Sequence, residues 1–198
     1  MEVGCGPGIV LRQLREIGFD CWGCELASPP LPEPLRPFVF VEQDCFQLDS
    51  ELRRSIDALL LFDVLEHIEG DVAFLRMPAD GFPNSRLLVM TVPARSELWS
   101  NYDEHYGHFR RYDRGGLAET LEEGGFTLLH SRYFFHELYL PALIAAKVWG
   151  QRTTMLQSPT WPGLHRIVAR VSRLCAAILP PGLPGMSLIA VARAKRGT

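Results

Sequence analysis

The sequence predicts an α/β domain in which a mostly parallel, seven-stranded sheet carries helices on both faces, with a small helical insertion before the last strand. Three observations lead to this prediction. Short apolar runs alternate with helical patterns over the first two-thirds of the 198 residues. One run, residues 57–62, is apolar enough for a central strand buried on both faces. Polar residues follow several runs, where a parallel sheet binds its ligands.

The order of the elements follows from these runs and from the residues that interrupt them. Prolines in residues 29–34 exclude a regular helix before the third strand. Gly18 ends the first helix, and residues 94–112 are expected to form a polar, aromatic-rich loop. The expected strands are residues 1–4 (a short stub), 20–25, 38–42, 57–62, 86–92, 126–133 and 187–194, and the expected helices are 9–17, 71–77, 113–123 and 164–179.

Composition narrows the class of protein. A hydrophobic fraction of 47% and a charged fraction of 22% are ordinary for one globular domain spanning 1–198. The net charge of −3 gives no basic field, so no nucleic-acid partner is expected. Five scattered cysteines do not form a disulfide framework, and no metal site is expected at Cys21 and Cys24, which fall in a strand. The chain has no signal-peptide pattern, so we expect a reducing, cytoplasmic location.

The insertion at 134–185 is expected to be a helical cap. Its first part, 134–150, is apolar but too short and too polar to span a bilayer, and 151–163 reads as a linker. The helix 164–179 sets arginines opposite an apolar stripe. We expect this stripe to cover the sheet or a substrate pocket. The alternative is peripheral contact of 164–179 with an anionic membrane, and hence membrane association.

A glycine-rich loop connects the first strand to the first helix. Gly4, Gly6 and Gly8 allow a positive φ and let a ligand approach bare main chain, beside the free N–H groups of a helix N-terminus. The spacing differs from the dinucleotide fingerprint, because Ile9 stands where its third glycine is expected. Taken alone, the loop is also compatible with a plain tight turn.

Two acidic residues extend the pattern. Glu25 ends the second strand, where a carboxylate can bind both ribose hydroxyls of an adenosine. Asp44 follows the third strand, where it can accept a hydrogen bond from an adenine amino group. Each acid alone is an ordinary strand terminus, but the loop and both acids in order favour an adenosine ligand.

At these residues the chain resembles the class I S-adenosylmethionine-dependent methyltransferases, specifically those related to ubiquinone and menaquinone biosynthesis. The resemblance covers about residues 1–133 and the last strand, and implies a Rossmann-like fold with S-adenosylmethionine as cofactor. The family's elements before the loop are absent, which implies a member shortened at its N-terminus. The segments that carry the resemblance are Glu2–Gly8, Glu25, Asp44–Phe46, Asp57–His67 and Leu98–Tyr112.

The resemblance also implies how the cofactor is held. The loop, Cys5 included, approaches the methionine part, and Glu2 lies beside its amino group. The ribose is held by Glu25. Further residues face adenine or close the pocket, and these are Asp44, Cys45, Phe62 and Asp63.

Methyl transfer needs mainly in-line alignment and exclusion of water, because the sulfonium cofactor already carries a good leaving group. A general base helps when the acceptor is a protonated oxygen or nitrogen. His67, His105 and His108 are candidates, because imidazole titrates near neutral pH. For His67, a role in shaping the site is the alternative.

The loop after the fifth strand is the candidate acceptor contact. Tyr106, Arg110 and Arg111 are expected to touch the substrate, with an arginine ready for an anionic group. The alternative is a structural connection in which the arginines pair with nearby carboxylates of Asp103, Glu104 or Asp113.

The function that the sequence predicts is methyl transfer to a small, hydrophobic acceptor, with O-, C- and N-methylation all open. A nicotinamide-dependent oxidoreductase is one alternative, which the glycine spacing and Asp44 disfavour. A non-catalytic, methyltransferase-like binding module is the other. The sequence makes no prediction about the oligomeric state.

Overall fold

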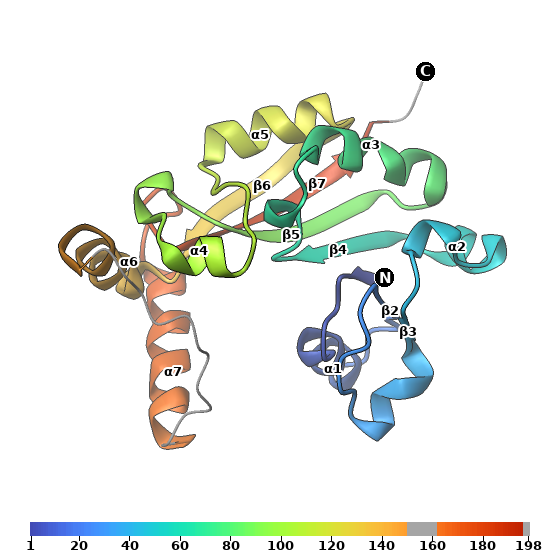
Figure 1. Cartoon of the computed structure of the whole chain (residues 1–198), viewed down its shortest axis with the longest axis horizontal. Helices are drawn as coiled ribbons and strands as arrows, with labels where there is room; N and C mark the ends of the chain where they lie inside the picture. Colours follow the sequence, from blue (N-terminus) through green and yellow to red (C-terminus); the bar gives the residue numbers. More distant parts are fainter. Residues whose placement is uncertain (150–161, 196–198) are drawn as a thin grey trace.

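The computed structural model describes residues 1–149 and 162–195, of which the side chains of 148–149 and 162–166 are not described. A seven-stranded sheet with the order β3-β2-β1-β4-β5-β7-β6 runs through it (Figure 1). Neighbours from β3 to β5 pair in parallel, and β7 is antiparallel to both β5 and β6. The predicted fold class, a mostly parallel sheet with helices, is therefore confirmed.

The seven predicted strands are all present, with shifted boundaries. The strands are β1 (Glu2–Val3), β2 (Gly23–Glu25), β3 (Val39–Val41), β4 (Ala58–Phe62), β5 (Leu87–Pro93), β6 (Phe126–Phe134) and β7 (Ser187–Ala194). The α-helices are α1 (Ile9–Glu16), α2 (Ser50–Ser55), α3 (Asp71–Gly81), α4 (Asn101–His105), α5 (Arg114–Glu123), α6 (His136–Ile144) and α7 (Pro162–Ile178). Short 3₁₀ turns are η1 (Glu33–Phe38), η2 (Cys45–Gln47), η3 (Leu65–His67) and η4 (Ser96–Leu98), and η5 (Ala145–Trp149) is a π-helical turn.

Alternation along β4 divides the core between the two faces of the sheet. Leu59 and Leu61 point into the main core, which includes Leu75 of α3 and Leu117 of α5. Leu60 points to the other face, into a smaller cluster. That cluster is built around Leu11 of α1, Cys21 and Leu35 of η1. Figure 1 shows α3 and α5 on one side of the sheet and α1 on the other.

Three helical segments differ from the sequence-based expectation. Helix α2 was not predicted, although Asp49 caps it by accepting from the backbone N–H groups of Glu51 and Leu52. Helix α3 continues through Pro78 to Gly81 instead of ending near residue 77. The expected loop 94–112 contains η4 and α4, and a capping box between Ser100 and Asp103 starts α4.

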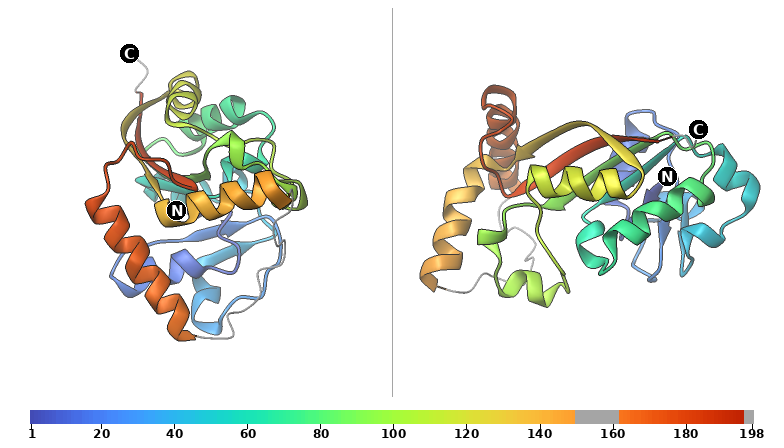
Figure 2. Two further views of the ribbon diagram at one scale, coloured as in Figure 1. Left: turned by 90° about the vertical axis from the view of Figure 1, so that its left-hand side faces the viewer. Right: turned by 90° about the horizontal axis from the view of Figure 1, so that it is seen from above.

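The insertion at 134–185 comprises α6, η5 and α7 at one end of the molecule (Figure 2). Most of the predicted linker 151–163 lies outside the described residues. The expected burial of the α7 stripe is wrong, because Ile167, Leu174 and Ile178 are 57%, 59% and 69% exposed. Within the described ranges, no helix combines the length and apolar character that crossing a bilayer requires.

The order of the sheet also places the functional loops. Strands on one side of β1 follow the order 3-2-1, and those on the other side begin with β4, so the order in which strands are added to the sheet reverses between β1 and β4. Ligands of open α/β sheets bind at the carboxyl ends of the strands beside such a reversal. The glycine loop, Glu25, Asp44 and the segment after β4 all follow parallel strands and therefore meet at this edge.

Candidate functional site

The glycine loop after β1 adopts the backbone that its sequence requires. Gly4, Gly6 and Gly8 all have positive φ, at 70°, 51° and 74°. A Cβ on Gly4 would lie 2.8 Å from Cγ2 of Val64, so the loop also packs too closely against the segment after β4 for any side chain there. The Gly4 N–H donates to the carbonyl of Cys24 at 2.8 Å, which fixes the loop to β2.

Glu25 is held in place by main-chain donors. Its Oε2 accepts from the Gly6 N–H at 2.9 Å, and its Oε1 accepts from the Ala27 N–H at 3.0 Å. Each carboxylate oxygen has a second acceptor site. Glu25 therefore ties the glycine loop to the end of β2 and retains lone pairs for a ligand hydroxyl.

A pocket of about 120 Å³ lies between the glycine loop and the ends of β2 and β3. Four of the residues predicted to bind the cofactor line it, namely Gly4, Glu25, Asp44 and Cys45. Sequence reasoning missed the other lining residues, because all but Gln43 are apolar or a thiol, and such side chains carry no motif signal of their own. They are Val3, Cys24, Leu26, Gln43, Phe46, Val64, Ile68 and Phe74.

A larger hollow, of about 980 Å³, lies elsewhere. It is lined by residues including Leu87, at the start of β5, and Phe126, at the start of β6. It therefore opens at the edge of the sheet opposite the acids, and none of the predicted cofactor, substrate or catalytic residues lines it. We assign the functional site to the smaller pocket.

Asp44 and Cys45 share a short turn but differ in what their side chains do. The Asp44 carboxylate caps η2 by accepting from the Phe46 N–H at 2.9 Å, and it also accepts from Nε2 of Gln47 at 3.4 Å. The Cys45 side chain is buried, and burial raises the pKa of its thiol to about 12. Asp44 thus presents an acceptor, whereas Cys45 contributes apolar surface.

Glu2 and Cys5 are buried behind the glycine loop and do not line the pocket. Burial raises the pKa of the Glu2 carboxyl to about 7. Its Oε2 is enclosed and has no hydrogen-bond partner among the described residues. A buried acceptor without a donor is costly unless a further group supplies one.

The predicted pair Phe62 and Asp63 ends β4 next to the pocket without lining it, and Val64 and Ile68 form that wall instead. Asp63 has a φ of 53°, which is unfavourable for a residue with a side chain. Its Oδ1 accepts from Oγ1 of Thr91 at 3.0 Å, and the surrounding protein raises the pKa of its carboxyl. Asp63 therefore occupies a strained position between β4 and η3.

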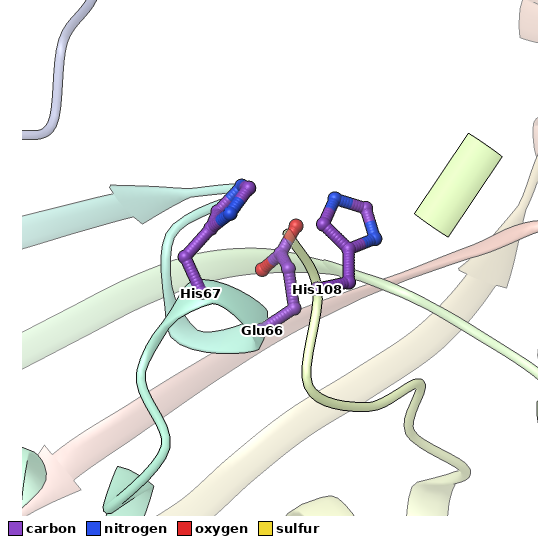
Figure 3. A group of neighbouring side chains, drawn as sticks. All are labelled: Glu66, His67 and His108. Atoms are coloured by element: carbon purple, nitrogen blue, oxygen red, sulfur yellow. The ribbon is translucent and has the colours of Figure 1, made fainter. Parts of the chain in front are cut away.

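His67 and His108 come from distant segments and lie side by side (Figure 3). Their ring centroids are 4.7 Å apart at an interplanar angle of 83°. The pKa of His67 is lowered, first because the neighbouring protein partly desolvates its imidazole and then because His108 lies beside it. Buried Glu66 is the third member, and burial raises the pKa of its carboxyl to about 8. The Phe109 N–H donates to the carbonyl of Glu66 at 2.8 Å and holds the two segments together.

Both predicted substrate arginines are paired with carboxylates. Arg111 pairs with Asp103, which the structural alternative named, and Arg110 pairs with Asp71, which it did not name. Arg111 is buried; its Nε donates to Oδ1 of Asp103 at 2.7 Å, and its Nη1 to the carbonyl of Ala94 at 3.0 Å. Arg110 pairs with Oδ2 of Asp71 at 2.5 Å. These ion pairs favour the structural alternative, and substrate contact by the two arginines stays a prediction.

The third histidine candidate, His105, is separate from the other two. It is exposed, and its ring packs edge-on against Tyr106 at 5.0 Å between centroids. Tyr106 also packs against Tyr102, with 4.6 Å between their ring centroids. The structure therefore joins His67 and His108 and places His105 with the tyrosines.

The strand order and the glycine loop with its acids at the carboxyl edge define the Rossmann-like fold of class I methyltransferases. The chain belongs to the methyltransferase domain family, whose sequence profile matches residues 1–131. No curated protein matches the chain. Membership of this family shows that the chain is an S-adenosylmethionine-dependent methyltransferase. The alternative prediction of a nicotinamide-dependent oxidoreductase is therefore wrong.

Solved structures share the fold at low sequence identity. A SAM-dependent methyltransferase from Archaeoglobus fulgidus has 17% identity and a TM-score of 0.54, covering 97% of this chain and 84% of that one. 1,6-Didemethyltoxoflavin-N1-methyltransferase from Burkholderia thailandensis, solved with S-adenosylhomocysteine, has 18% identity and a TM-score of 0.57. The match covers 98% of this chain and 70% of that one. A Haloferax volcanii protein described as a putative methyltransferase, in complex with its Trm112 activator, has 16% identity and a TM-score of 0.58. The match covers 100% of this chain and 82% of that one.

Proposed function

We propose that this methyltransferase modifies a small, hydrophobic acceptor and meets it at an anionic membrane surface through α6 and α7. The observation that carries the proposal is the exposed apolar side of α7. Exposed apolar patches of this kind mark contacts with membranes or other apolar partners.

The exposed residues of α7 have the chemistry of a membrane-surface helix. Ile167, Val171, Leu174 and Ile178 recur at helical spacing and are 42–69% exposed. Arg170 and Arg173 are also exposed on the same helix. A helix that combines apolar side chains with cations binds at the interface of anionic lipids, with the apolar side in the acyl boundary.

The neighbouring helix connects this surface to the active edge. Exposed apolar residues continue onto α6, where Leu140 and Ile144 are 63% and 50% exposed. The Tyr139 hydroxyl of α6 donates to Oε1 of Glu97 in η4 at 2.9 Å. Because η4 follows β5, a lipid-embedded acceptor would reach the carboxyl edge of the sheet beside α6.

The cofactor roles that the resemblance implies are compatible with the pocket. Gly4 leaves room for the methionine part, and Glu25 and Asp44 offer acceptors to ribose and adenine. The unpartnered Oε2 of Glu2 has the chemistry to accept from an ammonium group, but it lies behind the loop rather than in the pocket wall. S-adenosylmethionine supplies the activated methyl group on a sulfonium. The protein has to orient the acceptor and, for a protonated oxygen or nitrogen, remove its proton.

His67 is the proposed proton acceptor. Its lowered pKa keeps the imidazole neutral at neutral pH, and its side chain is exposed at the carboxyl edge. A neutral imidazole within reach of an acceptor hydroxyl or amine acts as a general base.

A methyl-transfer screen tests the acceptor class. Purified protein is incubated with methyl-labelled S-adenosylmethionine and with phenols, quinone precursors, lipids and amines, each with and without vesicles containing an anionic lipid. We expect incorporation into an apolar acceptor that rises when anionic vesicles are present. Transfer only to polar, water-soluble acceptors would overturn the proposal.

Vesicle sedimentation tests the surface itself. Ile178→Ser with Leu174→Ser should weaken binding to anionic vesicles and leave S-adenosylmethionine affinity unchanged. Ile17→Ser is a matched control, because Ile17 is 72% exposed but follows α1. Equal binding by the double variant and wild type, or equal binding to neutral vesicles, would contradict a membrane role for α7.

A further inference from the structure

Glu66, His67 and His108 form a compact group of metal-ligating side chains. One ligand atom from each lies within 4.8 Å of those of the other two. Glu66 and His67 belong to η3 after β4, and His108 lies beyond α4, so the tertiary structure creates the group. Figure 3 shows the Glu66 carboxylate between the two imidazole rings.

The Glu66 carboxylate is buried and one of its oxygens makes no hydrogen bond among the described residues. The residue is 1% exposed, and its Oε2 is buried without a hydrogen-bond partner among the described residues. A buried carboxylate is stable when it is paired, protonated or coordinated to a metal. Because Glu66 lies between two imidazoles, coordination of a metal ion by all three side chains can satisfy its carboxylate.

His108 is already oriented as a ligand. Its Nδ1 lies 3.0 Å from Oδ1 of Asp103, which is fully buried and also pairs with Arg111. Metal-bound histidines commonly donate their second N–H to such a carboxylate, which leaves Nε2 of His108 for the metal.

We propose that Glu66, His67 and His108 bind a divalent transition-metal ion, with Zn²⁺ as the best match to two imidazoles and one carboxylate. Zinc takes nitrogen and oxygen ligands at roughly 2.0–2.2 Å. Ligand atoms arranged tetrahedrally at that distance lie about 3.4 Å apart, so small side-chain rotations close the group around the ion. Because His67 is exposed, rotation at that position displaces no packed core.

Three protein ligands leave a fourth tetrahedral position open. Val64 and Ile68, which stand on either side of Glu66 and His67 in sequence, line the cofactor pocket, so the proposed ion would lie beside that pocket. An oxygen of the acceptor bound at the open position would have its pKa lowered by the ion. This inference goes beyond the proposed function, since metal binding does not depend on the identity of the acceptor. With the ion bound, His67 is a ligand, and the ion then takes over the base role proposed for His67 by lowering the pKa of the acceptor oxygen.

Metal titration of the full chain tests the site without an activity assay. Metal-depleted protein is titrated with Zn²⁺ by calorimetry and with Co²⁺ by visible absorption, in which a sulfur charge-transfer band would reveal cysteine ligands. We expect one ion per chain and a Co²⁺ spectrum without that band. A failure of wild-type protein to bind either ion stoichiometrically, or a sulfur-ligated spectrum, would overturn the proposal.

Variants identify the ligands. His67→Ala, His108→Ala and Glu66→Gln should each weaken Zn²⁺ binding by at least about 100-fold, whereas His130→Ala, an exposed histidine of β6, should not. Asp103→Asn should weaken binding about 10–100-fold through the orientation of His108. Circular dichroism confirms that each variant is folded, and His67→Ala is the most informative because it is exposed. Unchanged affinity in folded His67→Ala and His108→Ala would refute this ligand set, while the methyl-transfer screen tests the acceptor separately.

Discussion

The cofactor pocket and the Glu66–His108 group lie at the same edge of the sheet but are built in different ways. The pocket is made largely by main chain: glycines of positive φ, and carboxylates that accept from backbone N–H groups. The histidine group is made by side chains from segments some forty residues apart, held by Asp103 and Arg111. A site built from main chain depends on local sequence, whereas a side-chain network depends on how loops pack.

The two regions also differ in the groups that satisfy their carboxylates. In the pocket, Glu25 and Asp44 are satisfied by N–H donors, and Glu2 behind them has an unpartnered oxygen. In the second region, Asp103 is satisfied by charged partners and Glu66 has the unpartnered oxygen. Each region therefore contains carboxylates whose hydrogen bonds are satisfied, and one buried acid with an oxygen that makes no hydrogen bond among the described residues.

The largest effect is expected at Gly4, where main-chain geometry allows no side chain. Gly4→Ala places a Cβ 2.8 Å from Val64 and forces alanine to a φ of 70°. Strain and overpacking together should lower the free energy of unfolding by about 3 kcal/mol and abolish measurable cofactor binding. Urea denaturation and calorimetry measure the two quantities.

Gly18→Ala is the control, because Gly18 also has a positive φ, of 97°, but has open space around it. It should lose only about 1–2 kcal/mol and bind the cofactor normally. If Gly4→Ala were no worse than Gly18→Ala, close packing of the loop against Val64 would not matter.

A pH-dependent effect is expected next, at Glu2. Its folded-state pKa of about 7 exceeds the ordinary 4.5, so between these values the folded state keeps a proton that the unfolded state releases. Stability from this group is thus present below pH 4.5 and lost as the pH rises through about 7. The total loss is on the order of 3 kcal/mol.

Glu2→Gln removes this titration. In ligand-free protein, the stability of the variant relative to wild type should rise across this pH range, as measured by urea denaturation at several pH values. A difference between the two proteins that does not vary with pH would show that Glu2 ionises normally in the folded state.

The contrast between the two regions also explains what the sequence could predict. The strands follow from apolar runs, although their order in the sheet was not predicted, and Gly4, Glu25 and Asp44 were located because each stands at or just after the end of a strand. His67 and His108 were proposed separately, but nothing in the sequence indicated that Glu66 lies between them or that Asp103 orients His108. The arginines illustrate the same limit: Arg111 has the chemistry of an anion-binding residue, and only the packing reveals that Asp103 already neutralises it.

A smaller effect is expected at Glu25. Glu25→Ala deletes a charge-assisted hydrogen bond to the ribose and should weaken S-adenosylmethionine binding by about 2 kcal/mol. Because Gly6 also donates to this carboxylate, Glu25→Gln is the informative partner variant. It keeps one acceptor oxygen for the loop and should lose less affinity. Unchanged affinity of Glu25→Ala in calorimetric titration would refute the ribose role.

The smallest effect is expected at Arg110, which pairs with Asp71 at the surface of the second region and is 31% exposed in its side chain. Arg110→Ala should lower the free energy of unfolding by about 1 kcal/mol or less, because partly exposed ion pairs contribute little. Arg36→Ala, which breaks the exposed pair with Glu33, is the matched control and should lose still less. With the acceptor found in the screen, the KM of Arg110→Ala should equal that of wild type if the arginine only supports the loop. A tenfold rise in KM at unchanged stability would instead restore Arg110 as a substrate contact, and would mean that Asp71 releases it when the acceptor binds.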